Sequence, residues 1–145
     1  MIEKLNLGNN IDIGGHNING EWIKSNTRLW GGNMTAGQVV TVSLADIIPN
    51  DGYDYEIQLC DWINTGTTSG NEVKIFIYPT TSASGDRICI DKVRTRTASS
   101  RFSSGNAIIP IKANNRNITI KNETSVTSGS CGFFILEYRR IGTND

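Results

Sequence analysis

The sequence predicts an all-β domain, an antiparallel β-sandwich of jelly-roll-like form. Three observations predict it: short apolar segments alternate faces with period two, turns rich in Gly, Asn, Asp and Ser separate them, and helical periodicity is nearly absent. With 145 residues, the chain suits one domain with its own core. Its apolar fraction is 37%, and abundant Gly, Asn, Ser and Thr favour many turns and short strands.

The segment 132–141 reads Gly-Phe-Phe-Ile-Leu-Glu-Tyr-Arg-Arg-Ile and begins apolar on both faces. With strict alternation, Phe133 and Ile135 point one way, while Phe134, Leu136 and Tyr138 point the other. A strand with one wet face would carry polar residues at every second position. This strand is therefore expected to be covered on both sides.

Other segments with strand patterns precede it, and a helix of at most one turn fits near residues 44–48. The strand segments are residues 38–45, 53–63, 73–78, 87–97, 107–111 and 117–121. In the second of them, Tyr55, Ile57 and Leu59 share one face, and Cys60 and Trp62 share the other. The alternation separates the residues of each strand into two faces.

The first 27 residues differ from the rest, because isolated isoleucines stand among Gly and Asn. Such a segment cannot build a core alone. We predict two regions: residues 1–27, either a flexible arm or a short intertwined stalk, and residues 28–145, the β-sandwich. Trp22 and Ile23 are expected to mark the junction.

Apolar residues on both faces recur in segments 53–63 and 73–78. A sandwich core covers one face of each sheet, so the second face predicts contact with an identical subunit. The candidate apolar contacts are Phe76, Tyr78, Phe134, Leu136 and Tyr138. The alternative is that these are single surface side chains, which are common in soluble proteins.

Composition argues against several classes of protein. Lys and Arg number 14 and Asp and Glu number 14, unlike a basic nucleic-acid-binding protein. Neither a long apolar segment nor a signal-peptide pattern is present, so we expect synthesis in a cytoplasm, no signal peptide and no membrane insertion. The three cysteines, an odd number, are expected to be reduced and buried; they are Cys60, Cys89 and Cys131.

No catalytic, cofactor-binding or metal-binding residue is predicted. The single histidine, His16, lies in the Gly/Asn-rich segment without a triad or metal-ligand spacing around it. Asp51, Asp54, Glu56 and Asp61 are close in sequence and could flank a glycosidic bond. The same spacing also fits a turn followed by one strand face, which we favour.

Two groups of residues are candidates for binding. Lys92, Arg94 and Arg96 lie two residues apart, so they share a strand face and need carboxylates or an anion nearby. We favour ion pairs with adjacent strands or subunits over recognition of an acidic sugar. Trp62 and Trp30 are candidate sugar-binding residues, because an aromatic face suits the apolar face of a sugar ring.

Five segments together resemble the C-terminal knob domains of tailed-bacteriophage fibre and receptor-binding proteins. They are Leu-Ala-Asp-Ile-Ile-Pro-Asn-Asp-Gly-Tyr-Asp-Tyr-Glu-Ile from residue 44, Thr-Gly-Thr-Thr-Ser-Gly-Asn from 65, Thr-Arg-Thr-Ala-Ser-Ser from 95, Gly-Asn-Ala-Ile-Ile-Pro-Ile from 105 and Tyr-Arg-Arg-Ile-Gly-Thr-Asn from 138. The resemblance covers about residues 30–145, and it departs from a usual tail fibre in having hardly any shaft.

The resemblance implies a non-enzymatic homotrimeric knob on the virion surface that attaches to host-surface glycans or proteins. It implies contact with other virion proteins through residues 1–27 and no cofactor. It supplies no catalytic residues, and ligand-binding residues vary within the family. The alternatives are a structural virion decoration or fibre-tip protein without a host ligand and, as a third reading, a polysaccharide hydrolase.

Overall fold

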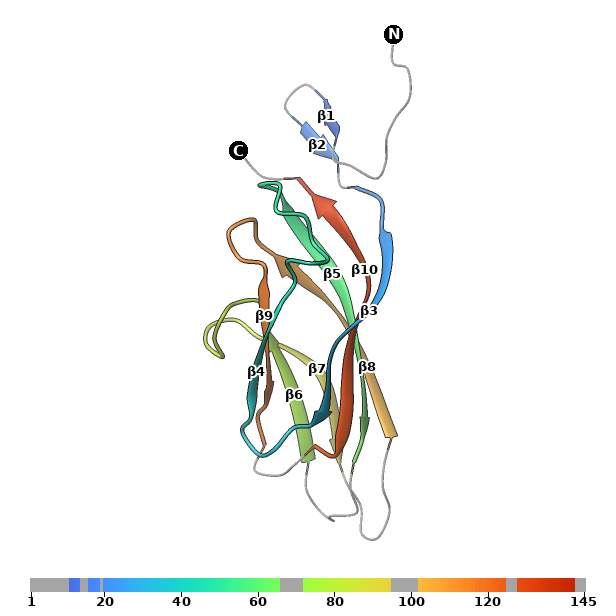
Figure 1. The fold of residues 1–145 in the computed structure, drawn as a ribbon, viewed down its shortest axis with the longest axis vertical. Coiled ribbons are helices and arrows are strands. Elements are labelled where there is room, and N and C mark those ends of the chain that lie inside the picture. Colours follow the sequence, from blue (N-terminus) through green and yellow to red (C-terminus); the bar gives the residue numbers. More distant parts are fainter. Residues whose placement is uncertain are drawn as a thin grey trace.

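The structure is a computed structural model, and it describes residues 11–13, 16–18, 20–65, 72–94, 102–124 and 128–142. Every regular element in these ranges is a strand (Figure 1). The strands are β1 (Ile11–Ile13), β2 (His16–Ile18), β3 (Ile23–Asn33), β4 (Val39–Ser43), β5 (Asp54–Asn64), β6 (Glu72–Tyr78), β7 (Ile88–Arg94), β8 (Phe102–Ile111), β9 (Asn117–Asn122) and β10 (Ser130–Ile141).

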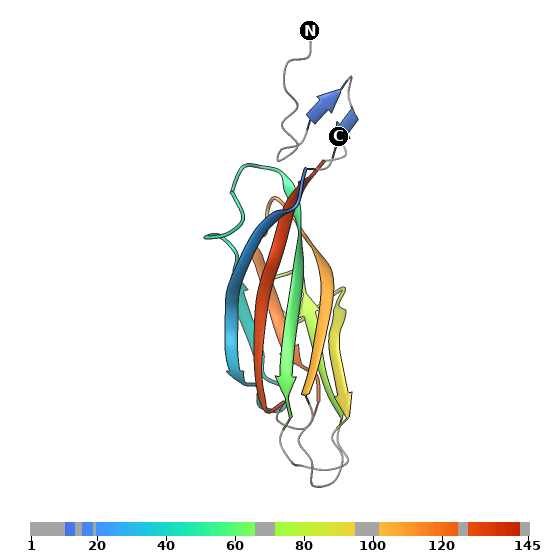
Figure 2. The ribbon, with the colours of Figure 1, turned by 90° about the vertical axis from the view of Figure 1, so that its right-hand side faces the viewer.

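Two four-stranded antiparallel sheets face each other, as Figures 1 and 2 show. One sheet has the order β3-β10-β5-β8 and the other has the order β4-β9-β6-β7, while β1 and β2 form a separate hairpin. The chain passes repeatedly from one sheet to the other, as in an eight-stranded jelly roll. The predicted all-β sandwich fold is confirmed.

The core lies between the sheets and follows the predicted period of two. In β5, every second residue from Tyr55 to Ile63 is buried, and the residues between them face outward. Opposite β5, the inward residues of β6 and β9 complete the core, all at most 1% exposed: Val73, Ile75, Ile77, Ile118 and Ile120. Burying one such side chain is worth about 1.5–3 kcal/mol. This apolar layer holds the outward side chains of β5 in fixed positions.

The alternation slips once in β10, and this corrects the predicted direction of Tyr138. Phe133 and Ile135 point inward as expected, but the register with β5 shifts between Ile135 and Glu137. The extra residue is Leu136, so it forms a β-bulge. Tyr138 then pairs with Ile57 and packs against the core, 6.2 Å from the ring of Tyr55. It therefore does not share the outer face of Phe134.

The sandwich begins earlier than the sequence indicates, because β3 spans the predicted boundary between residues 27 and 28. It pairs with β10 along its length and carries two register shifts, with Asn26 in a left-handed conformation (φ 51°). Asparagine tolerates this conformation better than most residues. Ser25 and Thr27 occupy alternate positions of β3 but are polar, so they give no apolar alternation in the sequence. Their hydroxyls hydrogen bond to each other at 2.7 Å. An irregular polar edge strand thus gave little sequence signal.

Candidate binding face

The candidate site lies on the outer face of the β3-β10-β5-β8 sheet, which Figure 2 presents to the viewer. The register of β5 with β8 places Asn64 opposite Phe102, Trp62 opposite Ser104, and Cys60 opposite Asn106. All these residues occupy the outward positions of their strands. Aromatic and amide side chains therefore share one surface.

Trp62 and Phe102 form a nearly parallel aromatic pair, with ring centroids 6.4 Å apart and an interplanar angle of 7°. Phe102 is 70% exposed, and Trp62 is half-buried. Nearly parallel rings with centroids 6.4 Å apart form an offset pair, in which the ring faces do not fully overlap. The pair offers an open aromatic surface to a ligand.

Glycine in the neighbouring strand explains why the Trp62 ring lies close to the sheet. Gly132 pairs directly with Trp62, and a Cβ at Gly132 would lie 2.5 Å from the indole Nε1 and 3.2 Å from the ring of Phe134. Any larger residue would displace the indole. The absence of a side chain at Gly132 thus leaves space on the outer face for the rings of Trp62 and Phe134.

Polar groups lie beside this aromatic surface. The Gln58 side-chain amide donates to the Asn106 amide oxygen at 3.2 Å, and both groups are on the outer face. The amide groups of Gln58 and Asn106 each have further N–H donors and oxygen lone pairs, which can hydrogen bond to an external partner. Ile108, 53% exposed, follows on the same face of β8. Aromatic rings with adjacent planar amides suit a ligand with an apolar face and a hydroxyl rim.

The structure places Trp30, the other sugar-binding candidate, against the core. It pairs with inward-facing Phe133, and their ring centroids are 6.2 Å apart. No motif or periodicity in the sequence pointed to Phe102, Gln58, Asn106 or Gly132 as site residues. The sequence predicted a strand over residues 107–111, whereas β8 begins at Phe102. The first half of β8, with Phe102, was therefore not considered as part of a site.

The predicted subunit contacts lie in different places. Phe76 and Phe134 lie on the outer faces of the two opposite sheets, and the Arg87 guanidinium lies 4.1 Å from the Phe76 ring centroid. Tyr78 is 4% exposed and donates its hydroxyl to Glu123, so it lies inside the subunit. Leu136 is half-buried at the bulge of β10.

The cationic cluster is partly engaged within the chain. On β7, Lys92 lies 3.6 Å from the Glu72 carboxylate, and exposed Arg94 is opposite Glu72 in the register. A hydrogen bond from Lys74 and the charges of Lys92, Lys74 and Arg94 lower the pKa of Glu72. This arrangement fits the ion-pairing interpretation of the cluster. The remaining member, Arg96, lies outside the described residues.

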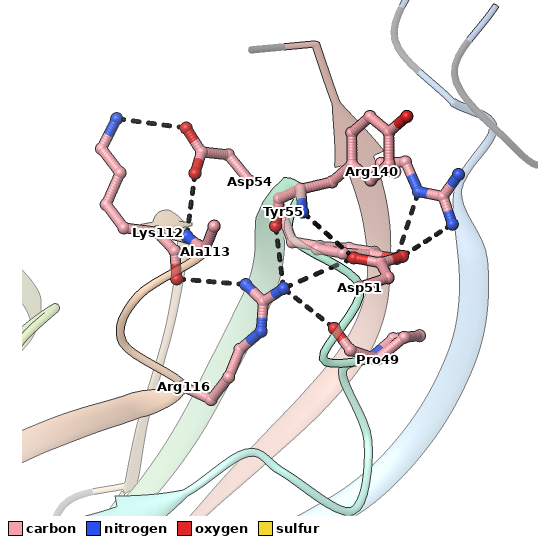
Figure 3. A network of polar contacts seen from close by, with 9 residues as sticks. Pro49, Asp51, Asp54, Tyr55, Lys112, Ala113, Arg116 and Arg140 are labelled. Atoms are coloured by element: carbon pink, nitrogen blue, oxygen red, sulfur yellow. Dashed lines mark hydrogen bonds and ion pairs between the residues drawn. The ribbon is translucent and has the colours of Figure 1, made fainter.

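A polar network joins the segment after β4 to the β8–β9 turn (Figure 3). Arg116, 8% exposed, donates to the carbonyl oxygens of Pro49 and Tyr53 at 2.8 Å and of Lys112 at 3.1 Å. Its guanidinium also lies 3.6 Å from Asp51. These contacts are all internal to the chain, so the network is a structural one.

Asp51 connects this network to β10. Its carboxylate accepts hydrogen bonds from the Tyr55 hydroxyl and from Arg140, both at 2.7 Å (Figure 3). Burial opposes ionisation of Asp51, but the hydrogen bonds from Tyr55 and the Tyr53 backbone and the charge of Arg140 outweigh it and lower its pKa. The segment that precedes β5 is thereby fixed to the end of β10.

A second polar cluster is buried between the sheets. Asp61 and Asp91, 3% and 6% exposed, are neighbours, and the Oδ2 atom of each is buried without a hydrogen-bond partner in the described structure. Asp61 Oδ1 accepts from the Gly105 backbone N–H, and Asp91 Oδ1 accepts from the Ser103 hydroxyl, both at 2.7 Å. Burial, followed by the neighbouring carboxyl of Asp91 and its negative charge, raises the pKa of Asp61 to about 8. The pair therefore holds a proton at neutral pH.

Gly105 allows this pair to form. A Cβ at this position would overlap the backbone carbonyl oxygen of Ile90 in β7, so only glycine permits such a close approach of the two sheets. That approach brings Asp91 of β7 next to Asp61 of β5.

The clustered carboxylates have internal partners rather than a shared cleft. Glu56 pairs with Arg139 at 2.5 Å, and Asp54 accepts from the backbone N–H of Ala113 at 2.8 Å. Within the described residues, no group of three or more His, Cys, Asp or Glu side chains could hold a metal ion. Over the same residues, no helix is long and apolar enough to cross a membrane.

All three cysteines are free, but they are not all buried. Cys131 points into the core and is buried. Cys60 lies on the outer face of β5 and is half-buried. Cys89 is exposed, which corrects the expectation that the cysteines are all buried.

No known protein family matches the sequence, and no curated protein matches it either. Among solved structures, a nora virus structure matches with 9% identity and a TM-score of 0.40 over 100% of this chain and 67% of that chain. Tobacco streak virus coat protein matches with 8% identity and a TM-score of 0.38 over 86% of this chain and 88% of that one.

A third similar structure is the CBM22-1–GH10 part of Clostridium thermocellum endo-1,4-beta-D-xylanase 10B complexed with xylohexaose. It shares 11% identity with a TM-score of 0.36, over 79% of this chain and 25% of that chain. At identities and TM-scores this low, these likenesses carry no argument about function. The function must be argued from the residues of the outer face.

Proposed function

We propose that this chain is a non-enzymatic knob on a virion surface that attaches to host-surface carbohydrate. The observation that carries the proposal is the open aromatic pair of Trp62 and Phe102, with the Gln58 and Asn106 amides on the same face. The sequence resemblance to phage fibre knobs supplies the virion context. Binding on such a face needs neither a cofactor nor a catalytic group.

The physical basis is the two-sided character of a sugar ring. Its C–H face packs on an aromatic ring, while its hydroxyls hydrogen bond to planar amides nearby. Phe102 and Trp62 supply the first kind of surface, and Asn106 and Gln58 supply the second. All four side chains project from paired strands, β5 and β8, so they are held in place before a ligand arrives.

The position of this face suits display at the end away from the attachment point. The backbone N–H of Gly20 donates to the Arg140 carbonyl at 2.8 Å, so the chain enters the sandwich beside the end of β10. Trp62 and Phe102 lie at the opposite end of the sheet, near the start of β10. We propose that residues 1–27, which include the first part of β3, join the knob to other virion proteins.

We further propose that the knob is a homotrimer. Phe76 on one outer face and Leu136 on β10 of the other sheet are the candidate contacts, since a closed ring of three joins two different patches of each subunit. Three weak sugar sites presented together bind a surface far more tightly than one. Phe134 is left out of this contact, because it lies beside Trp62 over Gly132.

The assembly is tested by measuring mass in solution. Sedimentation equilibrium of the full chain is expected to give a species of about three times 15.9 kDa. Phe76→Ser should reduce that mass if this residue is at the contact. A stable monomer over the micromolar range would contradict the trimer.

The glycan site is tested with Trp62→Ala. On a glycan array, the wild-type protein is expected to bind a defined set of sugars, and the variant should lose about tenfold or more of that affinity because the stacking surface is removed. Trp22→Ala is the matched control, since Trp22 lies against Arg139 at the other end of the sheet, 4.6 Å from ring centroid to guanidinium carbon. Equal losses in both variants would argue against a site at Trp62.

A second candidate function is a purely structural virion protein without a host ligand. It is favoured by the exposure of Phe102 (70%) and Ile108 (53%), which a neighbouring subunit could cover. Phe102→Ser separates the two candidates. A ligand-binding role predicts unchanged mass with weakened glycan binding, whereas a contact role predicts dissociation of the assembly and no array signal even for the wild-type protein.

A further inference from the structure

We propose that the sugar held on this face carries a carboxylate, and that Arg28 is the residue that binds it. This inference rests on the proposed carbohydrate-binding function and names the chemical class of the ligand. Two observations carry it: the Arg28 guanidinium lies over Gly31, which pairs with the glycine under the Trp62 indole, and no described carboxylate lies within ion-pair distance of Arg28.

The position follows from two glycines that pair across β3 and β10. Arg28 is opposite Phe134 on the outer face, and its side chain turns along β3 so that its guanidinium lies over Gly31, where a Cβ would overlap it. Gly31 pairs with Gly132, the residue under the Trp62 indole. Cα atoms of directly paired residues are roughly 4.5–5.5 Å apart. The cation and the aromatic ring therefore cover adjacent positions of one sheet.

The charge of Arg28 is uncompensated in the described part of the chain. No carboxylate there lies within ion-pair distance of Arg28, whereas Arg139 pairs with Glu56 and Arg140 pairs with Asp51. Arg28 is also exposed on an edge strand, so an external group can approach it. An anion from outside the chain would find a preformed partner there.

The arrangement suits a carboxylated sugar better than a neutral one. A guanidinium presents parallel N–H donors that match the two oxygens of a carboxylate. With the sugar ring on Trp62, a carboxylate on that ring reaches toward β3, while hydroxyls on the opposite side reach toward Asn106 on β8. The order of the strands, β3-β10-β5-β8, thus places cation, aromatic ring and amide in a line across the sheet.

The test uses three polymers, polygalacturonate, alginate and polysialic acid, and the same polymers after reduction of their carboxyl groups to alcohols. We expect the wild-type protein to bind at least one carboxylated polymer roughly 10- to 100-fold more tightly than its reduced form. Arg28→Ala should lose that preference while keeping the weaker binding to the reduced polymer. Arg28→Lys should recover only part of it, because lysine lacks the planar fork.

Lys24→Ala is the matched control, because Lys24 is an exposed cation on the same strand, opposite Glu137. It should retain the preference for the carboxylated polymer. Equal binding of carboxylated and reduced polymers, abolished by Trp62→Ala but unaffected by Arg28→Ala, would overturn this inference and leave the proposed function intact. If the wild-type protein binds none of the polymers, the inference is overturned. If it also binds no sugar on the glycan array, the proposed function is overturned too. Arg28-dependent binding to dextran sulfate alone would also overturn the carboxylate assignment.

Discussion

The free energy of unfolding is expected to fall by about 3–5 kcal/mol when Arg116 is replaced by methionine. Methionine keeps an unbranched, largely apolar stem, but it removes the guanidinium that donates to the carbonyl oxygens of Pro49, Tyr53 and Lys112 and lies 5.0 Å from the Tyr55 ring centroid. Three part-buried carbonyl oxygens would lose their donor, and leaving a desolvated acceptor without a partner costs about 1–3 kcal/mol. Urea unfolding followed by tryptophan fluorescence measures the loss.

Lys112→Met is the matched control for this prediction. Lys112 lies in the same turn, but its side chain is 69% exposed and its ion pair with Asp54 spans 3.5 Å. An exposed pair of this kind contributes about 0–1 kcal/mol. If both variants lose the same stability, the internal hydrogen bonds of Arg116 are not what holds the segment before β5 in place.

Asp61→Asn is expected to stabilise the protein at pH 8 and to flatten its dependence on pH. The pKa of Asp61 is raised to about 8 from an ordinary value of 3.8, so between these values the folded state binds more protons than the unfolded state. Stability from this group is therefore complete below about pH 4 and is lost as pH rises to about 8. Each pKa unit corresponds to about 1.4 kcal/mol, so the loss amounts to a few kcal/mol.

The new amide would remove this loss, because it is neutral throughout and can donate to Asp91 Oδ2, which has no hydrogen-bond partner in the described structure. Two thiols lie near Asp61, Cys131 of β10 and Cys60 of β5, and burial raises the pKa of both. Urea unfolding at intervals from pH 4 to pH 8 measures the effect. A variant that keeps the wild-type slope over this range would show that the Asp61–Asp91 pair does not share a proton.

Much of the fold could be predicted from the sequence, because one face of every sheet is packed on the core. The alternation of Tyr55, Ile57 and Leu59 with Cys60 and Trp62 correctly separated the two faces of β5. The same logic failed at Tyr138, since a bulge at Leu136 adds one residue and reverses every later side chain. No residue type at the bulge announces it in the sequence.

The binding face was harder to predict, because it depends on residues that lack a pattern of their own. Trp62 was predicted as a candidate from its aromatic side chain, and its role in binding stays a prediction. Phe102 was missed because it is the one apolar residue in the polar first half of β8, and Arg28 was missed because the inward positions before it in β3 are the polar residues Ser25 and Thr27. The roles of Gly31 and Gly132 depend on strand pairing, which brings residues about a hundred positions apart into contact.

The place of β10 in its sheet has a consequence for biosynthesis. It is the strand that β3 and β5 both hydrogen bond to, yet it follows all the other strands of the sandwich in the chain. While the ribosome is still translating residues 130–141, β3 and β5 have open inner edges and the core lacks Phe133 and Ile135. The domain must therefore complete its folding after this last strand leaves the exit tunnel, a slow non-local step during which chaperones would protect the nascent chain.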